Sequence, residues 1–221
     1  MCFSPQADLV AGLVTGAVGI DTLRHVRRSI DIPLAALPMV FAVHELIETF
    51  VWWGLDDRVG NTVYRAALWS YLLIAFVVVP ILVPAAVTLL EPLGNRLRMY
   101  LFVGGGVAVA AVLLFSLLRG PVEASIDGHH IEYHVSIWNG GVIVGLYVLA
   151  TCGPLLSSQH RRLRTLGLVN LVAAALLAWL SESSFVSLWC VWAAATSVVI
   201  ALHLRNTAMI HERGGVATLP S

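Results

Sequence analysis

The sequence contains no lysine and little charge of any kind. All thirteen basic residues are arginine, and Asp, Glu, Lys and Arg together make up 12% of the 221 residues, whereas soluble domains carry about 25%. The missing lysine excludes a photoreceptor with covalently bound retinal, because the Schiff base to retinal forms on a lysine. The net charge is zero, so no basic face for nucleic acid is indicated.

Cysteine is scarce and scattered. The three cysteines, Cys2, Cys152 and Cys190, lie far apart in the sequence and form no Cys-x-x-Cys pair, so a disulfide framework is not indicated. The N-terminus also lacks the positively charged start of a cleavable signal peptide, since MCFSPQAD places polar residues there. We therefore expect the first hydrophobic segment to be retained.

Long hydrophobic segments dominate the rest of the chain. Hydrophobic residues make up 58% of the sequence, and about 20 consecutive apolar residues suffice to cross a bilayer as a helix. The sequence predicts an all-α fold, a polytopic membrane bundle of seven transmembrane helices. It forms a single domain over residues 1–205, followed by a short cytoplasmic tail over 206–221. The predicted spans are 7–23, 33–55, 63–90, 99–118, 137–156, 165–180 and 186–204.

The distribution of arginine predicts the orientation of the bundle. With the N-terminus outside, ten arginines fall in cytoplasmic segments and three in outer segments, as the positive-inside rule requires. Seven spans then place the C-terminus in the cytoplasm. The cytoplasmic arginines are Arg24, Arg27, Arg28, Arg96, Arg98, Arg161, Arg162, Arg164, Arg205 and Arg213, and the outer ones are Arg58, Arg65 and Arg119.

Proline and glycine predict the shape and contacts of individual spans. Pro80 and Pro84 predict a kink in the third span, because proline removes a helical N–H and clashes with the preceding turn. Gly12 and Gly16 have the GxxxG spacing that lets two helix backbones approach closely in lipid. The glycines at 104–106 predict similar contacts for the fourth span.

Ionisable residues inside a span are costly and usually mark function. The second span carries His44, Glu45 and Glu48 within FAVHELIETFVWW, and Glu48 is a helix-face neighbour of both others. Two carboxylates and an imidazole on one turn suit metal binding or a shared proton. The alternative is an interhelical hydrogen-bond cluster that contains a protonated glutamate.

A histidine pair falls in the longest polar connection, on the outer side. His130 and His134 within DGHHIEYH share one face in a helix and in a strand, because four residues fit both periods. Their spacing resembles the HxxxH pattern of zinc sites. Histidines are also common in surface loops, so the pair alone does not establish a site.

Three classes of function fit these residues. In a membrane metalloenzyme, Glu48, His130 and His134 would bind a divalent transition metal at the outer face, with His44 or Cys190 as fourth ligand. Glu45 would be the general base toward a metal-bound water, and the substrate would be lipidic. Mixed His, Glu and Cys ligands favour zinc. The alternatives are a proton-coupled transporter and a metal- or haem-binding membrane sensor. The lipid bilayer is the expected partner, and the sequence leaves open whether the chain forms a homo-oligomer.

Three segments of the chain resemble a family of uncharacterised bacterial multi-pass membrane proteins. They are the starting Met-Cys-Phe-Ser, the second-span sequence LPMVFAVHELIETFVWW, and SLWCVWAAATS in the seventh span. The resemblance implies location in the bacterial inner (cytoplasmic) membrane and one shared site that contains Cys2, Glu48, His130, Trp189 and Cys190. It implies no activity.

Overall fold

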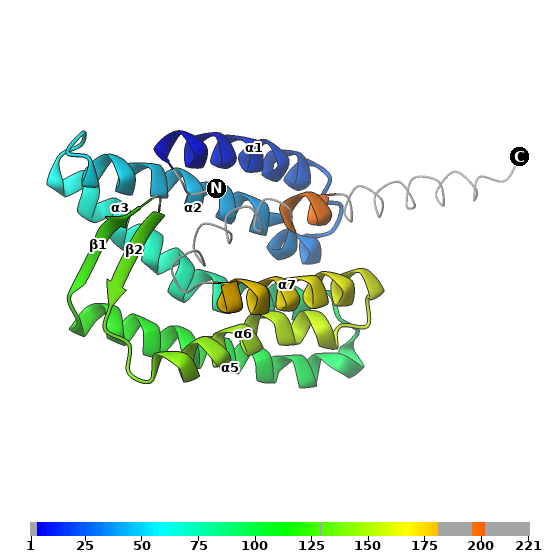
Figure 1. Cartoon of the computed structure of the whole chain (residues 1–221). Coiled ribbons are helices and arrows are strands. Elements are labelled where there is room, and N and C mark those ends of the chain that lie inside the picture. The colour runs from blue at the N-terminus through cyan, green and yellow to red at the C-terminus, as the bar shows by residue number, and fades with distance from the viewer. Residues whose placement is uncertain (1–3, 129, 181–195, 202–221) are drawn as a thin grey trace, which may run out of the picture.

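The computed structural model describes residues 4–128, 130–180 and 196–201 (Figure 1). The described part is mostly helical, as predicted, but it also contains an antiparallel two-stranded hairpin that the all-α prediction omits. The elements are α1 (Pro5–Arg24), a 3-10 turn (Ser29–Asp31), α2 (Ile32–Leu55), α3 (Asn61–Leu73), a π-helical turn (Ile74–Val78), α4 (Val79–Leu90), α5 (Leu93–Arg119), β1 (Val122–Asp127), β2 (His130–Val135), α6 (Gly140–Ser157) and α7 (Arg161–Leu180). Residues 196–201 are helical.

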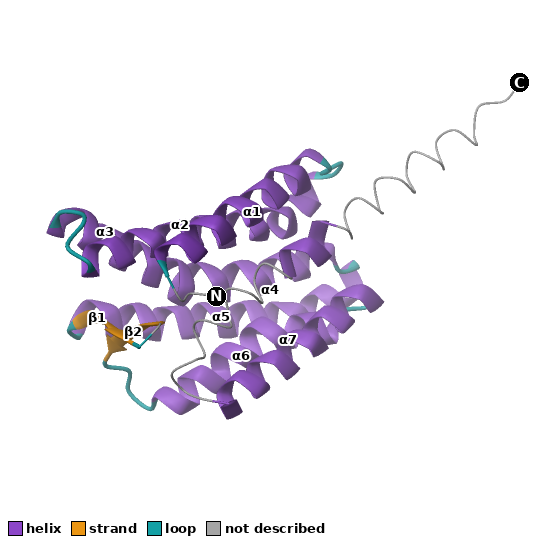
Figure 2. Cartoon of the chain, turned by 45° about the horizontal axis from the view of Figure 1, so that its top comes forward, coloured by secondary structure: helices purple, strands orange, loops and turns teal. Residues whose placement is uncertain are grey.

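The helices form a layered bundle with the hairpin at one end (Figures 1 and 2). Helices α1 and α2 pack side by side, α3 and α4 follow as the next layer, and α5, α6 and α7 lie on the other side. The hairpin joins α5 to α6. The connections from α4 to α5 and from α6 to α7 lie at the opposite end. The bundle therefore has a hairpin end and a loop end.

Within the described residues, four helical segments are long and apolar enough to cross a membrane. They are Ser29–Leu55, Asn61–Leu90, Leu93–Arg119 and Gly140–Ser157. They correspond to the second to fifth predicted spans. Helices α1 and α7 occupy the positions of the first and sixth, and α1 is less apolar because it carries two aspartates. Most of the predicted seventh span, like the tail 206–221, lies outside the described residues.

Glycines bring α1 and α2 into close contact. A methyl group added at Gly12 would lie 2.8 Å from the side chain of Leu46 and 3.2 Å from the backbone oxygen of Ala42. At Gly16 the methyl would lie 3.6 Å from the Ala42 side chain, which is an ordinary contact. The close approach predicted from the GxxxG spacing is therefore confirmed. It brings the other residues on this face of α1 onto α2.

The third predicted span is interrupted by the π-helical turn Ile74–Val78, one turn before the first of its prolines. In this turn each N–H bonds the carbonyl five residues back. The Ala75 carbonyl would therefore be bonded by residue 80, but Pro80 has no N–H to donate. The hydroxyl of Tyr147 on α6 donates to that carbonyl instead, at 2.8 Å. The break in the helix thus ties α6 to the centre of the bundle.

Of the three consecutive glycines on α5, one is needed for packing. A methyl group at Gly106 would lie 1.9 Å from the backbone oxygen of Pro80, an oxygen to which Pro84 cannot donate a hydrogen bond. Gly104 and Gly105 have no described atom within 4 Å of such a methyl. The contact predicted for this glycine run is confirmed only at Gly106.

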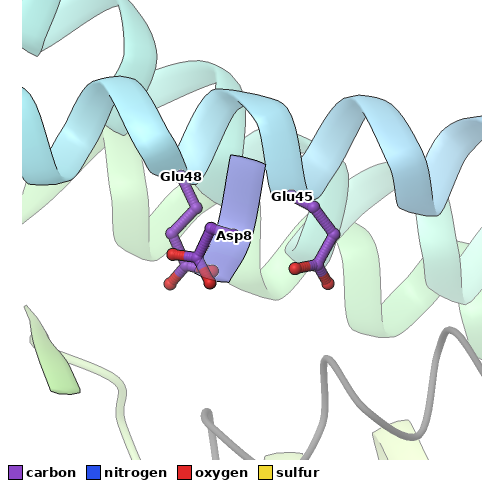
Figure 3. A group of neighbouring side chains, drawn as sticks. All are labelled: Asp8, Glu45 and Glu48. Carbon is purple, nitrogen blue, oxygen red and sulfur yellow. The ribbon is translucent and has the colours of Figure 1, made fainter. Parts of the chain in front are cut away.

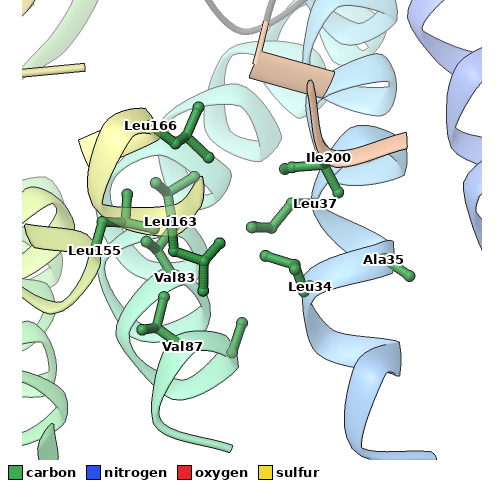
Figure 4. Packing of buried hydrophobic residues seen from close by; sticks show 11 residues of the cluster. Leu34, Ala35, Leu37, Val83, Val87, Leu155, Leu163, Leu166 and Ile200 are labelled. Carbon is green, nitrogen blue, oxygen red and sulfur yellow. The ribbon is translucent and has the colours of Figure 1, made fainter. Parts of the chain in front are cut away.

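The largest hydrophobic core lies toward the loop end of the bundle. Figure 4 shows side chains from α4, α6 and α7 facing side chains from α2 and from the helix at 196–201. The cluster includes Leu34, Ala35, Leu37, Val83, Val87, Leu155, Leu163, Leu166 and Ile200. It fixes the inner part of α2, the helix that carries the predicted site.

One buried carboxylate joins the two connections at the loop end. Glu91, 1% exposed, accepts hydrogen bonds from the Ser158 hydroxyl, from the Gln159 backbone N–H at 3.1 Å and from the Asn95 amide at 2.9 Å. The His160 ring nitrogen lies 3.4 Å from the same carboxylate. Burial alone would raise the pKa of Glu91, but the hydrogen bonds together outweigh it, so the pKa lies below its ordinary value of 4.5.

Candidate functional site: three buried carboxylates

Helix α2 places two carboxylates on one buried face near the hairpin end. Glu45 and Glu48 are three residues apart, so both point from the same side of the helix. Their exposed fractions are 3% and 0%. The same helix face carries the apolar residues of the core toward the loop end. The glutamates therefore point into the bundle, as expected from the cost of ionisable groups in lipid.

Helix α1 adds a third carboxylate, Asp8, whose exposed fraction is 0%. One oxygen from each of Asp8, Glu45 and Glu48 can be chosen so that all three lie within 4.8 Å of one another. Figure 3 shows the three carboxylate groups turned toward the same space. Among the described residues, this is the group of His, Cys, Asp and Glu side chains with the geometry to hold a metal ion.

The position of Asp8 follows from the start and the packing face of α1. Ser4 caps the helix, its side-chain oxygen accepting the N–H of Ala7 at 3.3 Å. Asp8 therefore lies in the first turn, where the positive end of the helix dipole stabilises a negative charge. It also precedes Gly12 by four residues, on the face that packs against α2. Sequence analysis missed Asp8, although its spacing to the GxxxG pair could have revealed it.

Three buried carboxylates this close cannot all be charged in isolation. Like charges at this distance repel strongly in a medium of low polarity, and burial removes the water that would screen them. A bound cation, shared protons or hydrogen-bond donors from elsewhere in the chain must offset part of the charge. The group therefore has the electrostatics of a cation site or of a proton-sharing site.

The β1–β2 hairpin covers these carboxylates with its apolar face. Residues along each strand alternate, and Ile131 and Tyr133 face the bundle. The Tyr133 hydroxyl donates a hydrogen bond to Glu48 Oε1 at 3.2 Å. Its ring stacks on Tyr71 with centroids 4.6 Å apart, and Tyr71 stacks on His44 at 3.9 Å. An aromatic stack thus runs from the Glu48 carboxylate to the buried imidazole of His44.

The structure places the predicted His130 and His134 on the other face of the hairpin. His134 is exposed, and its Nε2 lies 2.9 Å from the Ser125 hydroxyl and 4.0 Å from a Glu132 oxygen. Four residues along a strand span about 13 Å, so the two histidines share a face but are far apart. His130 is half-buried, and no described residue bonds its Nε2. Neither belongs to the carboxylate group.

The other predicted site residues are divided between two regions. His44 is buried beside the carboxylates, one helical turn before Glu48, and its Nε2 has no hydrogen-bond partner among the described residues. Cys2, Trp189 and Cys190 lie outside the described residues. The structure thus brings together Glu45 and Glu48 of the predicted set, adds Asp8, and keeps His44 close by.

The donor atoms of the group are all oxygen. Carboxylate oxygens are the preferred ligands of Mg²⁺, Ca²⁺ and Mn²⁺, whereas zinc sites usually include imidazole or thiolate. A zinc ion would therefore need nitrogen or sulfur ligands in addition to Asp8, Glu45 and Glu48. The Tyr133 hydroxyl adds a fourth oxygen beside Glu48.

The fold and the site together define a helical protein that associates with membranes and contains a buried acidic group. The chain belongs to a family described as "Family of unknown function (DUF6629)", whose model matches residues 1–213. This agrees with the resemblance to an uncharacterised family. No curated protein and no solved structure matches the chain.

Proposed function

We propose that this protein is an integral membrane protein that binds a divalent cation through Asp8, Glu45 and Glu48. The observation that carries the proposal is the grouping of three buried carboxylates, from two helices, with oxygens within 4.8 Å of one another. A divalent cation offsets most of their negative charge and satisfies several oxygens at once. The apolar surroundings strengthen that attraction, because little water screens it.

The proposed topology has seven transmembrane helices, with the N-terminus outside and the C-terminus in the cytoplasm of a bacterial cell. Helices at the first six expected positions and the excess of arginine on one side support it. In this orientation the hairpin end is the outer end. The carboxylates then lie in the outer part of the bundle beneath the hairpin, and the site is open to one side of the membrane only.

The proposed cation is one that prefers oxygen ligands, with Mn²⁺ as the most convenient test ion. The oxygen-only donor set supports this choice over zinc. Zinc remains the prediction for a site that also recruits His44, His130, His134 or Cys190. The two cases differ in selectivity, because added imidazole or thiolate ligands would greatly increase the preference for zinc over manganese.

A metal-dependent hydrolysis of a lipidic substrate extends this proposal. For that reaction the metal would make a water molecule more acidic, and a neighbouring carboxylate would accept its proton. Glu45 is our candidate for this general base, through the carboxylate oxygen that does not bind the cation, because Glu48 already accepts the Tyr133 hydrogen bond. A proton-coupled transporter or a metal-binding sensor would use the same carboxylates without hydrolysis.

The test is metal content and metal selectivity of the purified full chain. We expect about one divalent ion per chain by elemental analysis, and in competition a much smaller preference for Zn²⁺ over Mn²⁺ than imidazole or thiolate ligands would give. Affinity should rise with pH, because protons compete with the ion for the carboxylates. Glu91→Gln is the matched control, since it removes a buried carboxylate elsewhere. Wild-type protein that binds no divalent ion at any pH would favour the proton-coupled alternative.

A further inference from the structure

A second feature of the bundle is a partly open cavity of about 60 Å³ between the carboxylates and the loop end. Its walls come from α2, α4, α6, α7 and the helix at 196–201, and they are mostly apolar. Figure 4 shows part of them, with Val83 and Leu166 facing Leu34 and Leu37. At about 10–15 Å³ for each water-sized group, the space would hold a short chain of roughly four or five such groups.

One polar group in this cavity has no partner. Thr196 is 8% exposed, it lines the cavity, and its hydroxyl oxygen has no hydrogen-bond partner among the described residues. A buried hydroxyl without a partner is costly and calls for a missing ligand group or water. Two further polar residues, Thr151 and Asn170, also line the cavity, each bonded to a backbone carbonyl of its own helix.

The polar and apolar parts of the cavity are arranged along the bundle. Helix α6 runs toward Glu91 at the loop end, and α7 runs away from it. Thr151 therefore lies one turn farther from the loop end than Leu155 on α6, and Asn170 one turn farther than Leu166 on α7. The cavity is thus apolar toward the loop end and more polar toward the carboxylates.

Helix α2 connects the cavity with the carboxylates. Leu34, Leu37 and Phe41 line the cavity, and Glu45 follows Phe41 by four residues on the same helix face. One helical turn, about 5.4 Å along the axis, therefore separates the last cavity residue on α2 from the first carboxylate. A molecule with a polar head and an apolar chain could contact both at once.

We propose that this cavity binds the hydrocarbon chain of a membrane amphiphile that carries a hydrogen-bonding group beside the chain. The chain lies among Leu34, Val83 and Leu155, the hydrogen-bonding group pairs with Thr196, and the head points toward Asp8, Glu45 and Glu48. Only the position of the head rests on the proposed cation site. The chain position rests on the cavity itself.

A hydrocarbon suits this cavity better than water does. Water needs several polar partners, and cavities lined by Leu, Val and Ile stay dry and bind apolar molecules. The surrounding bilayer supplies hydrocarbon chains at high concentration. An alcohol or ester carbonyl at the polar end would also satisfy the Thr196 hydroxyl, which a pure alkane cannot do.

The test is photo-crosslinking of the full chain in phosphatidylcholine nanodiscs. One probe is an alkyl alcohol with a diazirine about four carbons from its hydroxyl, a length that the cavity accommodates, and a matched probe is the alkane that lacks the hydroxyl. Labelled peptides are identified by mass spectrometry. We expect the alcohol to label cavity residues such as Val83 and Leu155 in addition to lipid-facing residues such as Leu101, which is 78% exposed. Labelling confined to lipid-facing residues would overturn the proposal.

Two variants separate filling of the cavity from recognition by its polar end. Val83→Phe fills the space, and should lower cavity labelling at least tenfold while leaving Leu101 labelled. Thr196→Val keeps the shape and should lower cavity labelling by the alcohol severalfold without changing labelling by the alkane. Equal loss for both probes, or no loss, would contradict the role of Thr196. Val112→Phe, in the lipid-facing groove between α5 and α6, is the matched control.

Glu48→Gln separates this proposal from the cation site. The alcohol probe has no head beyond its hydroxyl, so Glu48→Gln should weaken Mn²⁺ binding and leave cavity labelling by the alcohol unchanged. If cavity labelling persists while neither wild type nor any variant binds Mn²⁺, the cation site is overturned and the hydrocarbon site stands. Mn²⁺ binding without cavity labelling would overturn the hydrocarbon site and leave the cation site standing.

Discussion

The molecule buries acidic side chains in two places, and it treats them in opposite ways. At the loop end, Glu91 is a single carboxylate surrounded by hydrogen-bond donors from Ser158, Asn95 and Gln159. Toward the hairpin end, Asp8, Glu45 and Glu48 face one another. Both regions are almost completely buried. The difference between them is the kind of neighbour, and it separates a structural carboxylate from a candidate binding site.

This contrast follows from electrostatics. A buried carboxylate is stable when donors replace the water that it has lost, and the lowered pKa of Glu91 reflects that replacement. Carboxylates that face one another destabilise each other until a cation or protons arrive. The first arrangement lowers the free energy of the folded state by itself. The second arrangement is unfavourable until a ligand binds, so it favours binding of a cation. Substitutions in the two regions should therefore affect stability and cation binding differently.

The largest effect is expected at the loop end. Glu91→Ala leaves the donors of Ser158, Gln159 and Asn95 buried without their acceptor, and each such group is costly. We expect a loss of about 3 kcal/mol in the free energy of unfolding, measured by equilibrium unfolding in mixed micelles. Glu123→Ala, which changes an exposed glutamate on β1, should stay within about 0.5 kcal/mol of wild type. Similar losses in the two variants would remove the distinction between the regions.

The carboxylate group should show the reverse pattern. Glu48→Gln keeps the shape of the side chain but removes one charged ligand, so Mn²⁺ affinity should fall about 100-fold, or about 2.7 kcal/mol. Without metal, the variant should be at least as stable as wild type, because one repelling charge is gone. Calorimetric titration and unfolding measure the two quantities. A large loss of stability in the absence of metal would mean that Glu48 is structural, as Glu91 is.

Removing a single hydrogen-bond donor from either region should have a smaller effect on the free energy of unfolding. Ser158→Ala removes a hydroxyl that bonds an ionised carboxylate, and we expect a loss of about 2 kcal/mol. Tyr133→Phe removes the hydroxyl that bonds Glu48 at 3.2 Å but keeps the stack on Tyr71. We expect a loss of about 1 kcal/mol there. A loss for Tyr133→Phe that exceeds that for Ser158→Ala would show that donors hold the outer carboxylates too.

The smallest effect concerns pH. Because the pKa of Glu91 is lower in the folded state than its ordinary value of 4.5, its contribution is present above pH 4.5. It is lost as pH falls through the folded-state pKa, with a slope of at most about 1.4 kcal/mol per pH unit. Glu91→Gln should lack this part of the acid dependence. Identical acid profiles of unfolding for Glu91→Gln and wild type would contradict this account.

Much of the fold could be predicted because it depends on properties visible in short stretches of sequence. Long apolar segments predicted the helices, and the GxxxG pair predicted the contact of α1 with α2. The π-helical turn could not be predicted, because the hydroxyl that completes it comes from Tyr147, far along the chain. The hairpin was missed as well, since the spacing of His130 and His134 fits a helix and a strand equally.

The site could be predicted only in part, for a related reason. Glu45 and Glu48 stand out because charged residues are rare inside apolar segments. Asp8 lies near the end of its helix, where a charge is ordinary, and only the packing of α1 on α2 brings it to the glutamates. Glu91 was also missed, because two of its partners, Ser158 and Gln159, are 67 and 68 residues away in the sequence. Residues that matter through distant contacts need the three-dimensional structure.

The most direct test of the cation site is an equilibrium Mn²⁺ titration of wild type beside Asp8→Asn, followed by electron paramagnetic resonance. Asp8 comes from a different helix than the glutamates, so its effect tests the assembled group and not α2 alone. The account predicts one tightly bound Mn²⁺ per wild-type chain and at least about tenfold weaker binding in Asp8→Asn, the effect of losing about 1.4 kcal/mol. Equal affinity in the two proteins, or no bound Mn²⁺ in wild type, would contradict it.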